Sequence, residues 1–235
     1  MPIVATRAGF LRGARAALPL TVGLLPFALV VGVLAQTQGL SALEQVLMSA
    51  LVYGGASQIL ALELWTDPAP IASATLAALA VNLRFALMGP ALAPWFDAVR
   101  GWRRWLMVGT IVDHAWALAV TEMRAGRHDA LFYLGTAAMM WSTWLVNTAL
   151  GHALGAVVAL PRGHPLFFAA PGCFIALLVP FWRGRGDVAP WAVAAAVSLG
   201  IGPLLPSPAL AVVAGAVAGS LVGALRETAG GTERG

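Results

Sequence analysis

The sequence contains no lysine, a single cysteine and few charged residues of either sign. Only 10% of its 235 residues are charged and 60% are hydrophobic, whereas soluble domains are nearer a quarter charged and half apolar. A soluble surface needs more polar cover than these residues provide. The composition excludes an ordinary soluble domain, and no hydrophilic block is long enough to fold separately. We therefore expect one integral membrane domain over residues 1–235.

Other absences remove further classes of function. Cys173 is the only cysteine, so no internal disulfide can form, and its apolar setting is typical of a packing residue. The four histidines lack metal-ligand spacing, and no Gly-x-x-x-x-Gly-Lys loop is present to bind ATP. The arginines are scattered near the ends of apolar stretches, which fits topology signals and lipid head groups better than nucleic acid. We expect no cofactor, no metal and no nucleic-acid partner.

Apolar stretches recur along the whole chain and predict an all-α, polytopic membrane helix bundle. A spanning helix needs about 20 mostly apolar residues, which gives about seven transmembrane segments, within a range of roughly six to eight. A short basic N-terminal segment covers residues 1–17, in which residues 2–15 fit a short amphipathic helix on the membrane surface, and residues 226–235 fit a flexible tail. The predicted segments are 18–35, 41–64, 70–93, 105–123, 130–160, 166–182, 188–205 and 209–225.

The charge pattern conflicts with a complete crossing by every segment. If the N-terminus is cytoplasmic, three full crossings place the arginines of 100–104 outside, against the positive-inside rule. One element before residue 100 is therefore expected to be broken or re-entrant. The candidates are the Gly54-Gly55 pair and the prolines Pro19 and Pro26. Such backbone is tolerated only where protein or a water-filled cavity satisfies it.

A faint similarity links the two halves of the chain. Proline-interrupted apolar helices precede glycine-rich ones at 19–55 and again at 203–219. Inverted repeats with broken helices are a feature of many secondary transporters, so the similarity suggests such a repeat. In the second half, Gly215, Gly219 and Gly223 are spaced by four. This ridge of small residues favours close helix packing over a substrate site.

The stretch 51–60 places two glycines and two polar residues inside an apolar segment. Gly54 and Gly55 each weaken a helix by roughly 1 kcal/mol relative to alanine and let another backbone or a ligand approach. Ser57 and Gln58 supply hydrogen bonds beside that opening. A helix broken there can bind a zwitterion with its freed amides and carbonyls. The alternative is a tight helix crossing in which Gln58 bonds to a neighbouring helix.

Arg84 lies inside the predicted segment 70–93. An arginine at such a depth costs about 2.5–3.5 kcal/mol on insertion scales, so it must face protein, water or a counter-charge. We expect it to pair with an acidic residue or to bind a substrate carboxylate. Asn82 precedes it by two positions, and on a regular helix the two side chains diverge by about 200°. They converge as a binding pair only if the helix unwinds there.

Asp113 and His114 lie near the middle of the predicted segment 105–123. A carboxylate beside an imidazole within a membrane is a candidate proton-coupling pair. A neutralising ion pair between Asp113 and Arg84 is the other interpretation. The two are compatible, because an ion pair that breaks on protonation is one way to couple transport to a proton.

These motifs together resemble the AzlC family, the large subunit of branched-chain amino acid exporters. The resemblance covers residues 18–225, and each motif is weak alone but fairly specific in order. The chain departs from the family pattern at Gly54 (usually Ala), Phe85 (usually His) and His114-Ala115 (often Glu-Ser). The motif-bearing stretches are Gly54-Gly55-Ala56-Ser57-Gln58, Asn82-Leu83-Arg84, Asp113, 135–155 with Trp144 and Gly151, and 174–180.

The resemblance implies a secondary transporter that exports valine-like, branched-chain amino acids across the bacterial inner (plasma) membrane as a multi-pass protein. It also implies a small AzlD-like membrane subunit as partner and an ion gradient as energy source. Substrate would meet Gly54, Gly55, Ser57, Gln58, Asn82 and Arg84, while Asp113 and His114 would carry the proton. No covalent chemistry is needed, so we expect no enzyme. The alternatives are a channel-like pore for a small solute and a non-transporting membrane assembly subunit.

Overall fold

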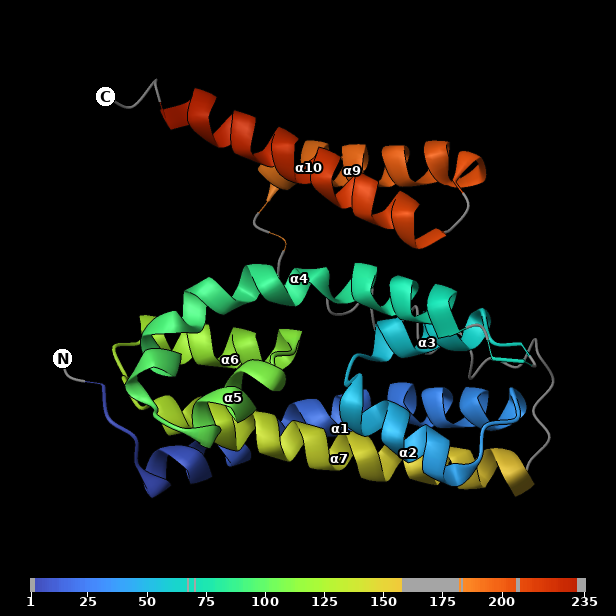
Figure 1. Ribbon diagram of the computed structural model, residues 1–235. Coiled ribbons are helices and arrows are strands. Elements are labelled where there is room, and N and C mark those ends of the chain that lie inside the picture. The colour runs from blue at the N-terminus through green and yellow to red at the C-terminus, as the bar shows by residue number, and fades with distance from the viewer. Residues whose placement is uncertain are drawn as a thin grey trace.

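The computed structural model describes residues 3–66, 68–69, 71–157, 182, 184–205 and 208–231. This part of the chain is helical and contains no β-strand beyond one isolated bridge between Val4 and Asp129, which confirms the all-α class. The predicted segment 166–182, with Cys173, lies outside the described residues except for Trp182. The helices are α1 (Arg7–Thr37), α2 (Ala42–Leu51), α3 (Gly55–Glu63), α4 (Ile71–Ala98), α5 (Trp102–Gly109), α6 (Asp113–Arg124), α7 (Ala130–Val157), η3 (Arg185–Asp187), α9 (Val188–Ile201), η4 (Gly202–Leu204) and α10 (Pro208–Gly231) (Figure 1).

Helices α1 and α7 form the centre of the bundle and run parallel to one another (Figure 1). A Cβ at Gly13 would collide with the carbonyl of Phe132, and a Cβ at Gly32 would collide with the carbonyl of Thr148. Contacts therefore advance along both helices in the same direction. The absence of side chains at these glycines lets the two backbones approach closely, as is common between membrane helices.

The prediction of a separate surface helix over residues 2–15 is wrong, because α1 is one helix from Arg7 to Thr37. Thr6 caps its first turn by accepting a hydrogen bond from the amide of Gly9 (3.0 Å). Pro19 and Pro26 lie inside the helix without ending it. A proline removes one backbone donor, and packing against neighbouring helices can offset that loss within a bundle.

The predicted segment 41–64 is interrupted at Gly54, as the charge pattern indicated. Helix α2 begins with a capping box between Ser41 and Glu44. It then runs antiparallel to α7, since His152 bonds to the carbonyl of Leu40 (2.8 Å) and Trp141 donates to the carbonyl of Ala50 (3.2 Å). Helix α3 leads from the middle of the bundle back toward the end where α2 began (Figure 1). The α2–α3 pair is therefore re-entrant.

Helix α4 returns along the bundle to the end where α1 begins. Its Trp95 ring lies 6.4 Å from that of Phe132, and its Phe96 ring lies 5.3 Å from that of Tyr133. Both partners belong to the first turn of α7. The helix is continuous through residue 84, so the unwinding that would make Asn82 and Arg84 converge does not occur.

The predicted continuous segment 105–123 is wrong, because the chain breaks between α5 and α6 at residues 110–112. Asp113 begins α6 instead of lying at its middle. At the other end of α6, Glu122 accepts hydrogen bonds from Arg12 (3.1 Å) and Arg127 (2.7 Å), which ties this end to the start of α1. The hydrogen bond to Glu122 holds the pKa of Arg127 above its ordinary value. The α5–α6 pair therefore also starts and ends on one side.

This arrangement explains the charge pattern. Residues 7–15, 100–104 and 124–127 all lie at the end of the bundle where α1 and α7 begin, which we call the basic end (Figure 1). Among the described residues between 7 and 100, α1 and α4 run the full length of the bundle. The α2–α3 pair enters from the end opposite the basic end and returns to it. The two interrupted elements thus enter from opposite ends. An inverted relation is therefore present within 42–124, and the repeat expected between 19–55 and 203–219 stays a prediction.

Helices α9 and α10 pack as a hairpin, and α10 contacts α4 (Figure 1). A Cβ at Gly219 would lie 2.7 Å from the carbonyl of Pro190, so the glycine ridge of α10 serves helix packing as predicted. Helical backbone continues to Gly231, into the segment expected to be a flexible tail. Among the described residues, Arg7–Thr37 and Arg185–Leu204 are long and apolar enough to cross a bilayer.

Candidate functional site

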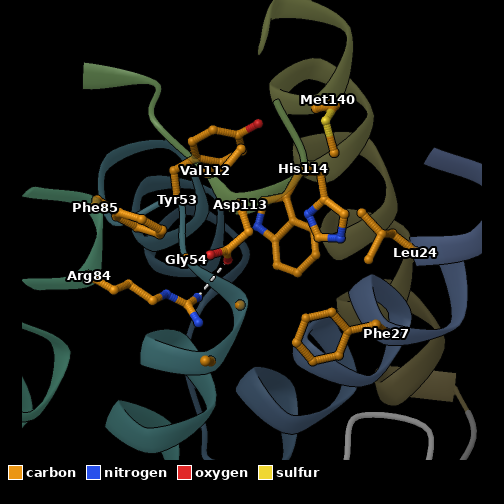
Figure 2. A pocket seen from close by; sticks show the side chains of 13 residues that line it. Leu24, Phe27, Tyr53, Gly54, Arg84, Phe85, Val112, Asp113, His114 and Met140 are labelled. Atoms are coloured by element: carbon orange, nitrogen blue, oxygen red, sulfur yellow. Dashed lines mark ion pairs between the residues drawn. The ribbon is translucent and has the colours of Figure 1, made fainter. Parts of the chain in front are cut away.

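The two helix breaks meet at a pocket in the middle of the bundle, where about 510 Å³ of empty space includes open solvent. The break before α3 and the break before α6 form two of its walls (Figure 2). Helices α1, α4 and α7 supply the remaining walls. Among the residues predicted to form the site, Gly54, Gly55, Arg84, Asp113 and His114 line this pocket.

An ion pair closes one side of the pocket. The guanidinium of Arg84 lies 2.9 Å from a carboxylate oxygen of Asp113, and Figure 2 shows the two side chains pointing toward one another. Their side chains remain 36% and 25% exposed, so the pair is accessible from the pocket. The expected pairing is therefore present. Arg84 also lies over the ring of Phe85, 5.1 Å from its centroid, and its Nε is buried without a hydrogen-bond partner.

The amino-terminal ends of two helices face the same cavity. Gly54 is the N-cap of α3 and Val112 is the N-cap of α6, and neither helix has a side-chain cap. The first amides of a helix have no partner within the helix, and its dipole makes that end favourable for negative charge. Asp113 already occupies the start of α6. The uncapped start of α3 remains open to an anionic group.

The turn before α3 depends on an unusual backbone conformation. Tyr53 has a φ of +42°, in the left-handed region that non-glycine residues rarely adopt. Such a conformation costs of order 1–3 kcal/mol and often occurs at functional sites. It reverses the chain within a few residues, so that Gly54 and Gly55 reach the pocket wall.

Ser57 and Gln58 lie behind the pocket, outside its lining. The hydroxyl of Ser57 donates to the carbonyl of Gly54 (2.7 Å), across the first turn of α3. The amide of Gln58 donates to Ser49 (2.9 Å), and its carbonyl accepts from the indole of Trp144 (3.0 Å). Both residues are fully buried. They hold the break in place and join it to α2 and α7.

Asn82 also lies outside the lining and faces the break instead. A Cβ at Gly54 would come within 2.9 Å of Asn82 Oδ1. That oxygen is buried and has no hydrogen-bond partner. The amide therefore sits against the backbone of the break, while Arg84, two residues further, reaches the cavity. His114 does line the pocket, and its Nε2 is likewise buried without a partner.

The AzlC protein family matches residues 19–158, which include every residue of the pocket. The chain belongs to the AzlC family. It is 28% identical over 222 residues to the inner membrane protein YgaZ of Escherichia coli K12, an alignment that covers 91% of this chain and 89% of that one. An uncharacterized membrane protein of Archaeoglobus fulgidus is 29% identical over 220 residues, covering 91% and 93%. No solved structure matches the chain. It is therefore a membrane protein of this family.

Several lining residues of the site in this AzlC protein were not predicted from the sequence. Apolar side chains are expected at every position of a membrane helix, so nothing in their spacing marks those that face a cavity. Phe85 and Trp144 were named only as parts of the family resemblance. The missed lining residues are Leu24, Phe27, Tyr53, Val112 and Met140.

Proposed function

We propose that this chain is a secondary transporter that exports branched-chain, valine-like amino acids across the bacterial inner membrane. It does so as a multi-pass protein, coupled to protons and together with a small AzlD-like membrane subunit. The observation that carries the proposal is the ion pair between Arg84 and Asp113, placed in a pocket where two uncapped helices begin. Membership of the AzlC family supports the choice of an amino acid over another small solute.

The pocket offers complementary partners to each part of an aliphatic amino acid. The substrate carboxylate bonds to the guanidinium of Arg84 and to the open amides at the start of α3. The substrate ammonium lies beside the carboxylate of Asp113. The side chain then faces the apolar walls from α1 and α7. No covalent bond forms or breaks in this scheme.

Coupling follows from competition for Arg84. While the pocket is empty, Arg84 and Asp113 neutralise one another at 2.9 Å. A bound carboxylate draws the guanidinium away, and the substrate ammonium replaces it as the counter-charge of Asp113, whereas a proton on Asp113 removes the charge that attracts the ammonium. His114 is adjacent and can exchange the proton. Substrate and proton thus exclude one another at one site, as export against an inward flow of protons requires.

The proposal is tested by valine efflux from loaded cells that make both subunits. Arg84→Ala and Asp113→Asn should each reduce efflux at least tenfold. Arg104→Ala is the matched control, because Arg104 forms an ion pair of similar length with Asp97 (2.8 Å) on the exposed surface at the basic end. That variant should export at the wild-type rate. Unchanged efflux in both pocket variants, at equal membrane levels, would refute the residue roles.

A further inference from the structure

The pocket has an apolar side opposite the ion pair. Leu24, Phe27 and Met140 lie across the cavity from Arg84 (Figure 2). Trp144 also lines the pocket, and its ring packs against that of Phe27, so it belongs to this apolar wall. Phe27 and Trp144 are buried, and Met140 is 5% exposed. A ligand whose carboxylate meets Arg84 must therefore place its side chain against these four residues.

The indole of Trp144 is held in one orientation. Its ring nitrogen donates to the side-chain carbonyl of Gln58 at 3.0 Å, and Gln58 in turn donates to Ser49 at 2.9 Å. Gln58 and Ser49 are both fully buried. A buried indole N–H keeps its partner because losing it leaves a donor unsatisfied. The orientation of this wall is thus set by a residue of α3, outside the pocket.

The helix break fixes how close the two aromatic rings lie. A Cβ at Gly55 would collide with the ring of Phe27 and would approach Cη2 of Trp144 to 2.8 Å. The two ring centroids are 5.5 Å apart, with the planes tilted by 55°. The two rings thus occupy the space that a side chain at Gly55 would need. The depth of the cavity beyond the ion pair therefore depends on the size and the orientation of these rings.

We propose that Trp144 limits the size of the substrate side chain and that Gln58 is the residue that positions it. The inference rests on the proposed function, since it assumes an amino acid anchored at Arg84. Trp144 contacts the end of the side chain, so branched aliphatic chains fit and aromatic ones do not. Gln58 acts only through the indole, by keeping the ring across the end of the cavity.

The test is a competition experiment in cells that make both subunits and are loaded with valine, leucine and phenylalanine together. In Trp144→Leu the ratio of phenylalanine to valine export should rise at least about tenfold, the usual effect of relieving a size mismatch in an apolar pocket. Trp141→Leu is the matched control. Trp141 lies on the same helix and also donates its indole N–H, to the carbonyl of Ala50 at 3.2 Å, but does not line the pocket. The ratio of phenylalanine to valine export should not change in Trp141→Leu.

Gln58→Leu separates positioning from folding. If Gln58 only stabilises the fold, its loss lowers the maximal rate for every amino acid equally and leaves the export ratio unchanged. If it positions Trp144, the ratio shifts in the direction of Trp144→Leu, and the KM for valine rises more than the maximal rate falls. An unchanged ratio in Gln58→Leu overturns the positioning role.

Trp144→Phe keeps a ring and decides the question if Trp144→Leu does not reach the membrane. The size-selection proposal is overturned if the Trp144 variant that reaches the membrane exports phenylalanine and valine in the same ratio as Trp141→Leu. The proposed exporter function is unaffected by that result. A wild-type chain that exports none of the three amino acids overturns the proposed function, and the size-selection proposal with it.

Discussion

At the residue scale, Arg84 is the residue that most needs partners from the rest of the structure. An arginine within the membrane is tolerated only with partners, and the structure supplies Asp113 at 2.9 Å and the ring of Phe85 beneath the guanidinium. The sequence predicted the ion pair with Asp113 as one of two interpretations, but it did not predict the contact with Phe85. Asn82 shows the opposite case. It was grouped with Arg84 from its place in the motif, and the continuous helix α4 separates the two side chains.

The planar shape of Arg84 yields a prediction. Arg84→Lys keeps the charge but loses the fork that can bond a carboxylate with two nitrogens. We expect the KM for valine to rise about tenfold, as expected when one strong hydrogen bond of about 1.5–3 kcal/mol is weakened. The measurement is the concentration dependence of efflux from loaded vesicles.

Arg103→Lys provides the comparison, because Arg103 also lies over an aromatic ring, 5.8 Å from the centroid of Trp102, but at the exposed basic end. Its KM should equal that of the wild type. Equal KM values for Arg84→Lys and the wild type would contradict a carboxylate contact at Arg84.

At the element scale, the informative features are two helices that stop and restart. The Gly54-Gly55 break was predictable, because adjacent glycines weaken a helix and the charges required one incomplete crossing. The break at residues 110–112 was not predicted, although Gly109 and the β-branched residues of Thr110-Ile111-Val112 are weaker helix formers than alanine. It is stabilised by contacts with the rest of the bundle, among them the hydrogen bond from Trp116 to the carbonyl of Met88 (3.1 Å). Such residues are common in membrane helices, so they do not by themselves mark a break.

The close contact between α1 and α7 makes a second prediction. Gly32→Ala places a Cβ against the carbonyl of Thr148, with no flexible side chain that could move aside. The two helices must separate locally, so the midpoint of thermal unfolding in detergent should fall by several degrees. Gly23→Ala, in the same helix, introduces a Cβ into open space. It should leave the midpoint unchanged or raise it, because alanine is the better helix former by about 1 kcal/mol. Equal midpoints would contradict the packing of α1 on α7.

At the scale of the whole molecule, the parallel pair α1 and α7 determines the path of everything between them. The chain leaves α1 at one end and must return to the other before α7 begins. One full passage, α4, accomplishes this, so α2–α3 and α5–α6 each return to the side from which they enter. Three arginine-containing segments consequently gather at the basic end, in agreement with the positive-inside tendency.

This path predicts which residues share a side of the membrane. In a Cys173→Ala background, single cysteines at Arg103 and Arg124 should be protected from a membrane-impermeant maleimide added to intact cells. A cysteine at Thr37, which is exposed at the opposite end, should react. Permeabilised cells should label all three. Equal labelling of the cysteines at Arg103 and Thr37 in intact cells would contradict the re-entrant path of α2–α3.

The sequence by itself determined that this is an all-α membrane protein with a broken helix at Gly54-Gly55 and with polar residues at Arg84 and Asp113 that need partners. Those conclusions follow from composition, charge and the cost of burying polar groups, which are local properties of the chain. Only the tertiary structure decided that the second break meets the first, that Arg84 and Asp113 pair there, and that Phe27 and Trp144 form the opposite wall. Membrane helices are apolar on nearly every face, so their sequences do not mark which face meets a neighbouring helix. That face is selected by the close packing of backbones at small residues.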